Sequence, residues 1–162
     1  MNMEPPLQQT REAWLNYVAQ RMGPMFERLG APLPAQLRIA IGFTSSGRRS
    51  RHIGECWDNQ CSEDRHFEIF IRPDLSESKD LMPMQVAAIL GHELVHAAIG
   101  VAAGHRKEFR RVARGIGLRR ADGSDYGRAR IRGGTLADSK RRAFAPRQTA
   151  IDQWRQQSFQ PP

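Results

Sequence analysis

The chain is 162 residues long, 40% hydrophobic and 26% charged, which fits one domain with its own buried core. It has neither the roughly 20 consecutive apolar residues of a membrane-spanning helix nor the basic start and apolar run of a signal peptide. We therefore expect a cytoplasmic protein with no membrane partner. We also expect a monomer, and its small size suits a bacterium or a phage-infected cell. The net charge of +8 is uneven, because residues 1–104 hold 10 Lys/Arg and 12 Asp/Glu, whereas residues 105–162 hold 15 and 5.

Residues 10–29 are predicted to form an amphipathic helix. Their apolar side chains recur at spacings of three and four, the period of one helix face. Thr10 is a candidate N-cap, since its hydroxyl can accept a hydrogen bond from the first turn. The helix could be interrupted at Gly23 and Pro24, because proline removes a backbone donor.

A small sheet is predicted next. Residues 37–43, 52–57 and 66–73 are short runs rich in β-branched or aromatic side chains, separated by polar turns. We expect three antiparallel strands. In the third run, alternation puts Phe67, Ile69 and Ile71 on one face and Glu68, Phe70 and Arg72 on the other.

Two cysteines, Cys56 and Cys61, lie in this region. They are too few for a disulfide framework or a zinc ribbon. In a cytosolic protein we expect both thiols to stay reduced.

Two helices are predicted after the sheet. Residues 83–99 carry an apolar surface wide enough for a buried helix, with Pro83 suited to the first turn and Gly100 to the C-terminal stop. A second helix is expected over residues 105–116, ending at Gly117.

The first of these helices contains the sequence GHELVHAAIG. His92 and His96 are four residues apart, so they lie on one helix face and can both bind one ion. Glu93 lies beside them without being a ligand, where its carboxylate can take a proton from a zinc-bound water and return it to the leaving amine. The pattern therefore predicts a zinc hydrolase with one catalytic Zn²⁺ ion and Glu93 as its acid/base.

A third protein ligand is needed, because catalytic zinc usually has three and keeps the fourth position for water. The metzincin spacing is excluded, since it requires Gly and His where the chain has Ile99 and Ala102. Glu108 would be the ligand of a thermolysin-type site. His105 is favoured, because residues 100–104 are able to turn the chain back toward the metal.

The segment HELVHAAIGVAAGHRKEF resembles the SprT-like (Spartan-related) zinc metalloproteases, in which H-E-x-x-H is followed by Gly-His and an aromatic residue, here Phe109. The likeness covers roughly residues 35–118 and is weaker in the strands. It implies an α+β, zincin-like minimal metalloprotease domain that acts on proteins, and the best-known eukaryotic members degrade proteins attached to DNA. The chain departs from many members because no cysteine, and so no zinc ribbon, follows Cys61.

We therefore expect a SprT-like domain over residues 1–118 and a basic, partly irregular extension over residues 119–162, with a short element near residues 151–154. Clustered arginine favours a nucleic-acid partner, because it neutralises phosphates, although a solvated basic tail or an acidic protein partner fits the same charge. The candidate nucleic-acid contacts are Arg106, Arg110, Arg114, Arg119, Arg120, Arg128, Arg130, Arg132, Arg141 and Arg142.

The expected function is zinc-dependent endopeptidase activity on protein or peptide substrates, with DNA-associated proteins as one candidate class. The alternative is a non-catalytic accessory protein that binds DNA and uses zinc only to hold two helices together. The fourth coordination position separates them, because a closed site indicates structure and an open one indicates chemistry.

Overall fold

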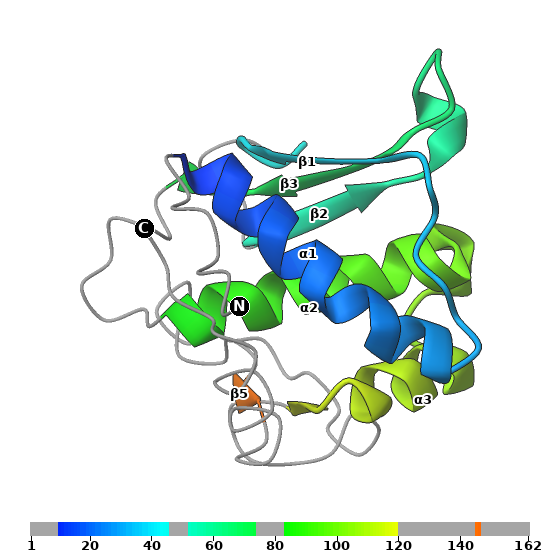
Figure 1. Ribbon diagram of the computed structural model, residues 1–162. Coiled ribbons are helices and arrows are strands. Elements are labelled where there is room, and N and C mark those ends of the chain that lie inside the picture. Colours follow the sequence, from blue (N-terminus) through cyan, green and yellow to red (C-terminus); the bar gives the residue numbers. More distant parts are fainter. Residues whose placement is uncertain (1–9, 46–51, 74–82, 120–144, 147–162) are drawn as a thin grey trace, which may run out of the picture.

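The computed structural model describes residues 10–45, 52–73, 83–119 and 145–146, which form a mixed α+β fold (Figure 1). Three α-helices and a three-stranded sheet make up most of this part of the chain, as expected from the sequence. Helix α2 lies beside the sheet and packs against β2, α1 and α3. None of the helices in these residues is both long enough and apolar enough to cross a lipid bilayer.

Helix α1 spans Arg11–Arg28 and begins as predicted. The Thr10 hydroxyl accepts a hydrogen bond from the backbone N–H of Ala13, at 3.1 Å, which caps the first turn. Pro24 lies inside the helix without interrupting it. The helix buries Val18 and Met22 before the proline and Met25 and Phe26 after it, so packing on both sides offsets the lost backbone hydrogen bond.

The sheet consists of β1 (Leu37–Ile41), β2 (Gly54–Trp57) and β3 (Phe67–Ile71), in the order β1-β3-β2. Strand β2 pairs antiparallel with β3, but β1 pairs parallel with β3, so the prediction of an antiparallel sheet is wrong for that pair. The physical reason is the long connection over residues 42–53, which does not impose hairpin pairing between β1 and β2. The apolar β3 takes the centre instead.

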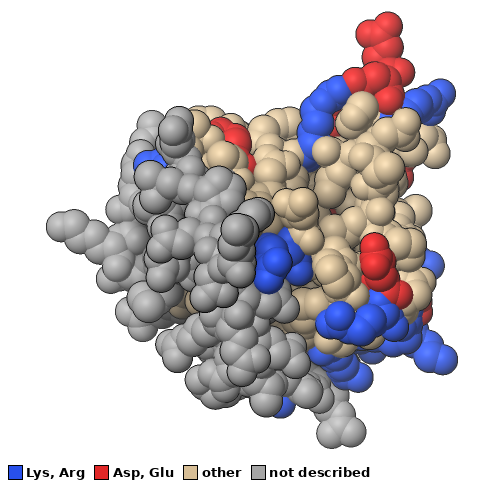
Figure 2. All heavy atoms as spheres, in the orientation of Figure 1, with Lys and Arg blue, Asp and Glu red and all other residues tan. Residues whose placement is uncertain are grey.

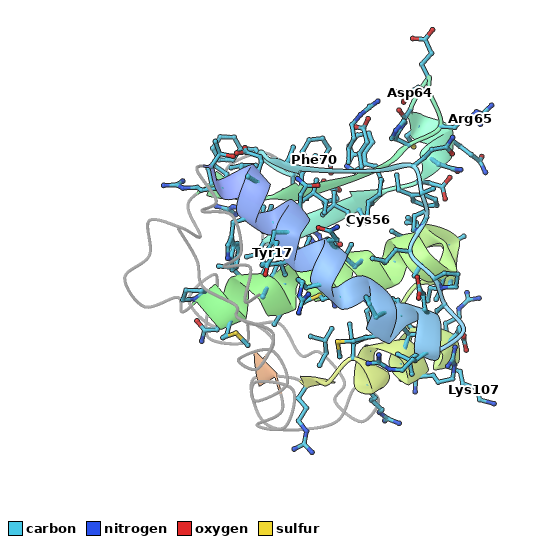
Figure 3. The ribbon with its side chains drawn as sticks, in the orientation of Figure 1. Tyr17, Cys56, Asp64, Arg65, Phe70 and Lys107 are labelled. Atoms are coloured by element: carbon cyan, nitrogen blue, oxygen red, sulfur yellow. The ribbon has the colours of Figure 1, made fainter. Side chains whose placement is uncertain are left out.

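The two faces of β3 follow the predicted alternation. Ile69 and Ile71 are buried against the helices, and Phe70 projects from the opposite side of the sheet to Cys56 of β2 (Figure 3). The outer face is partly covered, since the Phe70 ring lies over Gly42. Arg72, placed by alternation on this outer face, is buried.

Helix α2 spans Pro83–Ile99, with the bounds that the sequence predicts. It ends at Gly100, whose φ of 85° is the left-handed conformation that favours glycine. Because helices and sheet surround it, the residues on most sides of α2 are buried, from Ala87 to Val95. The helix that carries His92 and His96 is therefore the centre of the core.

A short 3-10 turn, η4 (Val101–Ala103), leads to α3 (Lys107–Gly115). The predicted start of this helix at His105 is two residues early, because Arg106 occupies the N-cap position and His105 lies outside the helix. Strand β4 (Leu118–Arg119) then pairs antiparallel with β5 (Ala145–Pro146), a pairing that the sequence did not predict. The element expected near residues 151–154 lies outside the described residues.

Candidate metal centre

Three histidines from two segments converge at the C-terminal half of α2. One helical turn separates His92 from His96, and the chain reverses through Gly100 and Gly104, both at positive φ, to bring back His105. The Nε2 atom of His105 lies 3.1 Å from Nε2 of His92 and 3.1 Å from Nε2 of His96. The ligand atoms of the three side chains all lie within 4.8 Å of one another, close enough to bind one metal ion.

The aromatic ring of Phe109 supports this cluster from α3. Its centroid lies 4.9 Å from that of His92, 4.7 Å from His96 and 4.6 Å from His105, with edge-on or tilted geometry. Phe109 is fully buried. One buried side chain thus packs against all three imidazoles. The sequence marks Phe109 only as the aromatic residue of the SprT-like pattern, because it does not show that the histidines lie against this ring.

Burial sets the charge of the imidazoles. It lowers the pKa of His92 well below its usual range, and the neighbouring His96 and His105 lower it further. Burial, followed by His105, also lowers the pKa of His96 to about 4. Both rings are therefore neutral near pH 7, and neutral imidazole nitrogen is the form that binds metal.

The Nδ1 atom of His96 is buried and has no hydrogen-bond partner within the described residues. Packing and the contacts of its Nε2 atom therefore position the ring.

Glu93 lies next to the histidines on α2 and is 7% exposed. Burial raises the pKa of its carboxyl to about 8, and the negative charge of Glu55 on β2 adds to the effect. A carboxyl group with a pKa near neutrality can both accept and donate a proton at physiological pH. The influence of Glu55 was not predicted, because it depends on the approach of β2 to α2.

The other ligand candidate, Glu108, is separate from this cluster. Its exposed carboxylate pairs with Arg111, with the shortest N–O distance at 2.6 Å. Arg111 also donates to the backbone oxygen of Leu29 at 2.8 Å, joining α3 to the end of α1. The thermolysin-type alternative therefore has no support at Glu108, and the geometry favours His105 as the third ligand.

Four of the candidate nucleic-acid contacts fall within the described residues. Arg106 and Arg114 are exposed on or next to α3, whereas Arg110 and Arg119 are half-buried. Arg110 donates to the backbone oxygen of His105 at 3.2 Å, so it has a structural role beside the metal centre. The remaining six lie outside the described residues: Arg120, Arg128, Arg130, Arg132, Arg141 and Arg142.

Both cysteines are free thiols. Cys56 is buried on β2, and burial, with Glu93 and Asp58, raises the pKa of its thiol to about 12. Cys61 is exposed, at the end of the 3-10 turn η2 (Asn59–Cys61). Neither belongs to a metal-binding cluster in the described part of the chain.

No protein-family model, curated protein or solved structure matches this chain. The likeness to SprT-like proteases therefore rests on the residues themselves, the H-E-x-x-H sequence of α2 and His105 beyond it.

Proposed function

We propose that this protein is a zinc-dependent endopeptidase with a zincin-like domain, similar to the SprT-like proteases. The observation that carries the proposal is the convergence of the Nε2 atoms of His92, His96 and His105 beside the buried carboxyl of Glu93. A tetrahedral ion with zinc–nitrogen bonds of about 2.0–2.1 Å needs its nitrogen ligands about 3.3 Å apart, close to the 3.1 Å found here. Three imidazoles are also a donor set that zinc accepts.

The three histidines would hold the ion, and zinc bound there would supply the Lewis acidity that activates water and polarises a peptide carbonyl. The protein contributes proton transfer and orientation. The Glu93 carboxylate accepts a proton from the attacking water and then donates it to the nitrogen of the leaving amine. Phe109 holds the imidazoles in place, and the surrounding core limits the access of further water to Glu93.

An open coordination position favours catalysis over a purely structural role. The cluster in the described residues contains three histidines and no fourth ligand, whereas structural zinc sites close with four. His105 is on the exposed side of the cluster. We expect a substrate carbonyl to approach the ion from this side.

The test compares metal content and peptide cleavage in four purified proteins: wild type and the Glu93→Gln, His96→Ala and Glu108→Gln variants. We expect one zinc per chain and casein cleavage in the wild type, zinc without cleavage in Glu93→Gln, and neither in His96→Ala. Glu108→Gln is the matched control, because it alters an exposed glutamate outside the cluster, and it should retain both. A wild type that lacks zinc, or that cleaves no faster than Glu93→Gln, would contradict the proposal.

A role on DNA-associated proteins is favoured by the charge of α3. Five cations lie on or directly before this helix, with Glu108 as its only acid: Arg106, Lys107, Arg110, Arg111 and Arg114. On the face shown in Figure 2, lysine and arginine side chains gather where α3 lies. Since α3 begins just after His105, DNA bound there would lie close to the metal centre.

Changing Arg106, Lys107 and Arg114 together to Gln should weaken binding to a fluorescent DNA duplex and lower the slope of log K against log salt by about 3. These three residues are exposed, so the variant should keep its zinc. An unchanged salt slope would contradict DNA binding through α3. DNA binding by a wild type that shows no zinc-dependent cleavage would instead favour the accessory-protein alternative.

A further inference from the structure

The first residue of β2, Gly54, lies directly against the side chain of Glu93. A Cβ atom added at Gly54 would be 2.9 Å from Glu93 Oε1 and 3.0 Å from Glu93 Cγ. It would also be 3.2 Å from Cγ2 of Ile89, one turn earlier on α2. Distances this short lie inside ordinary van der Waals contact, so any side chain at this position would displace the carboxylate or separate the strand from the helix.

The backbone at Gly54 does not itself require glycine. Gly54 pairs with Ile71 in the antiparallel ladder, and its φ lies outside the positive range that makes Gly100 and Gly104 depend on glycine. A glycine within a strand commonly marks the close approach of another group. Here that group is the Glu93 carboxylate.

Packing is what fixes this carboxylate. No hydrogen bond from a described residue holds it, although Glu93 is 7% exposed. Ile89 lies on one side of it, Gly54 of β2 on another, and buried Cys56 lies on the same face of β2 as Gly54. The position of the carboxylate relative to His92 and His96 therefore depends on how closely β2 approaches α2.

We propose that Gly54 is a positioning residue for peptide hydrolysis: lacking a side chain, it lets β2 close on Glu93 and fixes the carboxylate beside the metal ligands. Only one part of this inference rests on the proposed function, namely the role of Glu93 in catalysis. The contact between Gly54 and Glu93 stands independently of it. Two measurements address these two parts separately.

The first measurement is a double-mutant cycle in thermal stability, which needs no enzymatic activity. Gly54→Ala should lower Tm by roughly 5 °C or more in the wild-type background, because the new methyl meets Glu93. In the Glu93→Ala background the same change should lower Tm much less, since the two closest atoms, Glu93 Oε1 and Cγ, are gone and only the longer contact with Ile89 remains. An equal decrease in Tm in both backgrounds would overturn the proposal. A protein with Gly54→Ala that folds only when Glu93→Ala is also present would support it.

The matched control is Gly42→Ala. Its Cβ would lie 3.0 Å from the Phe70 ring on the far side of the sheet, so it introduces a similar crowding away from Glu93. Its effect on Tm should be the same with Glu93 and with Ala at position 93. A dependence on residue 93 as strong as that of Gly54→Ala would mean that the sheet responds as a whole, and would overturn the specific role of Gly54.

The second measurement is steady-state cleavage of a peptide by the zinc-loaded proteins. A carboxylate displaced by about 1 Å should lower kcat by about 10- to 100-fold, with KM and zinc content near those of the wild type. Gly42→Ala should keep the wild-type kcat. A stability coupling with unchanged kcat in Gly54→Ala would leave Gly54 purely structural and overturn the positioning role, whereas failure of the proposed function would appear in the wild type itself.

Discussion

The Nε2 atom of His105 lies 3.1 Å from that of His92, although the two residues are 13 positions apart in the sequence. The reversal between them is short and contains two glycines at positive φ, Gly100 and Gly104. Their conformations therefore determine whether the third imidazole reaches the two on α2.

The first prediction concerns the third ligand. His105→Ala should lower zinc affinity by at least about 100-fold, because it removes one of three ligands, and the zinc-dependent rise in Tm should shrink with it. Glu108→Ala is the control on the same segment and should bind zinc as the wild type does. Competition with a chromogenic chelator measures both affinities. Equal affinities for the two variants would eliminate His105 and reopen the choice of ligand.

The second prediction tests the turn. Gly100 adopts a φ of 85°, a conformation that costs a residue with a Cβ roughly 1–2 kcal/mol, so Gly100→Ala should destabilise the protein by about that amount and weaken zinc binding. Gly23→Ala is the matched control. Gly23 lies inside α1 at a φ that is not positive, so Ala at this position avoids the cost of a positive φ, and Gly23→Ala should change stability by less than Gly100→Ala. Urea unfolding at fixed zinc concentration compares the two, and destabilisation of similar size would contradict the conformational argument.

Local patterns predicted the helices well, because their determinants are close in sequence. The bounds of α2 follow from Pro83, the apolar surface and Gly100, and the capping role of Thr10 in α1 follows from its hydroxyl. The convergence of His92 and His96 needs only the helical period. The start of α3 was two residues early, because periodicity does not reveal that Arg106 occupies the N-cap position.

The sequence did not predict the features that depend on pairing between strands far apart in the chain. The parallel pairing of β1 with β3 depends on which strand takes the centre of the sheet, and β4 meets β5 across a long stretch of sequence. Nothing local to Gly54 shows that Glu93 lies against it, although a glycine within the predicted strand over residues 52–57 is a general sign of a close approach. The sequence therefore reveals the H-E-x-x-H motif itself, whereas the residues packed around the motif are set by tertiary contacts that the sequence does not show.

The third prediction concerns the two thiols. Cys61 is exposed, whereas Cys56 is buried and its thiol has a pKa of about 12, so only Cys61 should react with a thiolate-selective reagent near pH 8. The native protein should release one equivalent of chromophore rapidly, and the unfolded protein two. Cys61→Ser should abolish the rapid phase, whereas Cys56→Ser should leave it intact. Rapid modification of Cys56 in the folded protein would contradict its burial.

The last prediction concerns pH and the stability of the metal-free protein. The pKa of Glu93 is raised from 4.5 to about 8 in the folded state. Below pH 4.5 the group is protonated whether the chain is folded or not, and the stability linked to it is fully present. Above this pH the unfolded chain releases the proton while the folded chain keeps it, so stability is lost progressively until pH reaches about 8.

Glu93→Gln removes this penalty while preserving the shape of the side chain. It should stabilise the chelator-treated protein by roughly 2–5 kcal/mol near pH 8 and by little near pH 4. Glu108→Gln is the control with the opposite sign, because Arg111 lowers the pKa of Glu108 and favours its charged form. Chemical unfolding across this pH range measures both variants. A gain from Glu93→Gln that does not grow with pH would show that burial does not raise the pKa of this carboxyl in the folded protein.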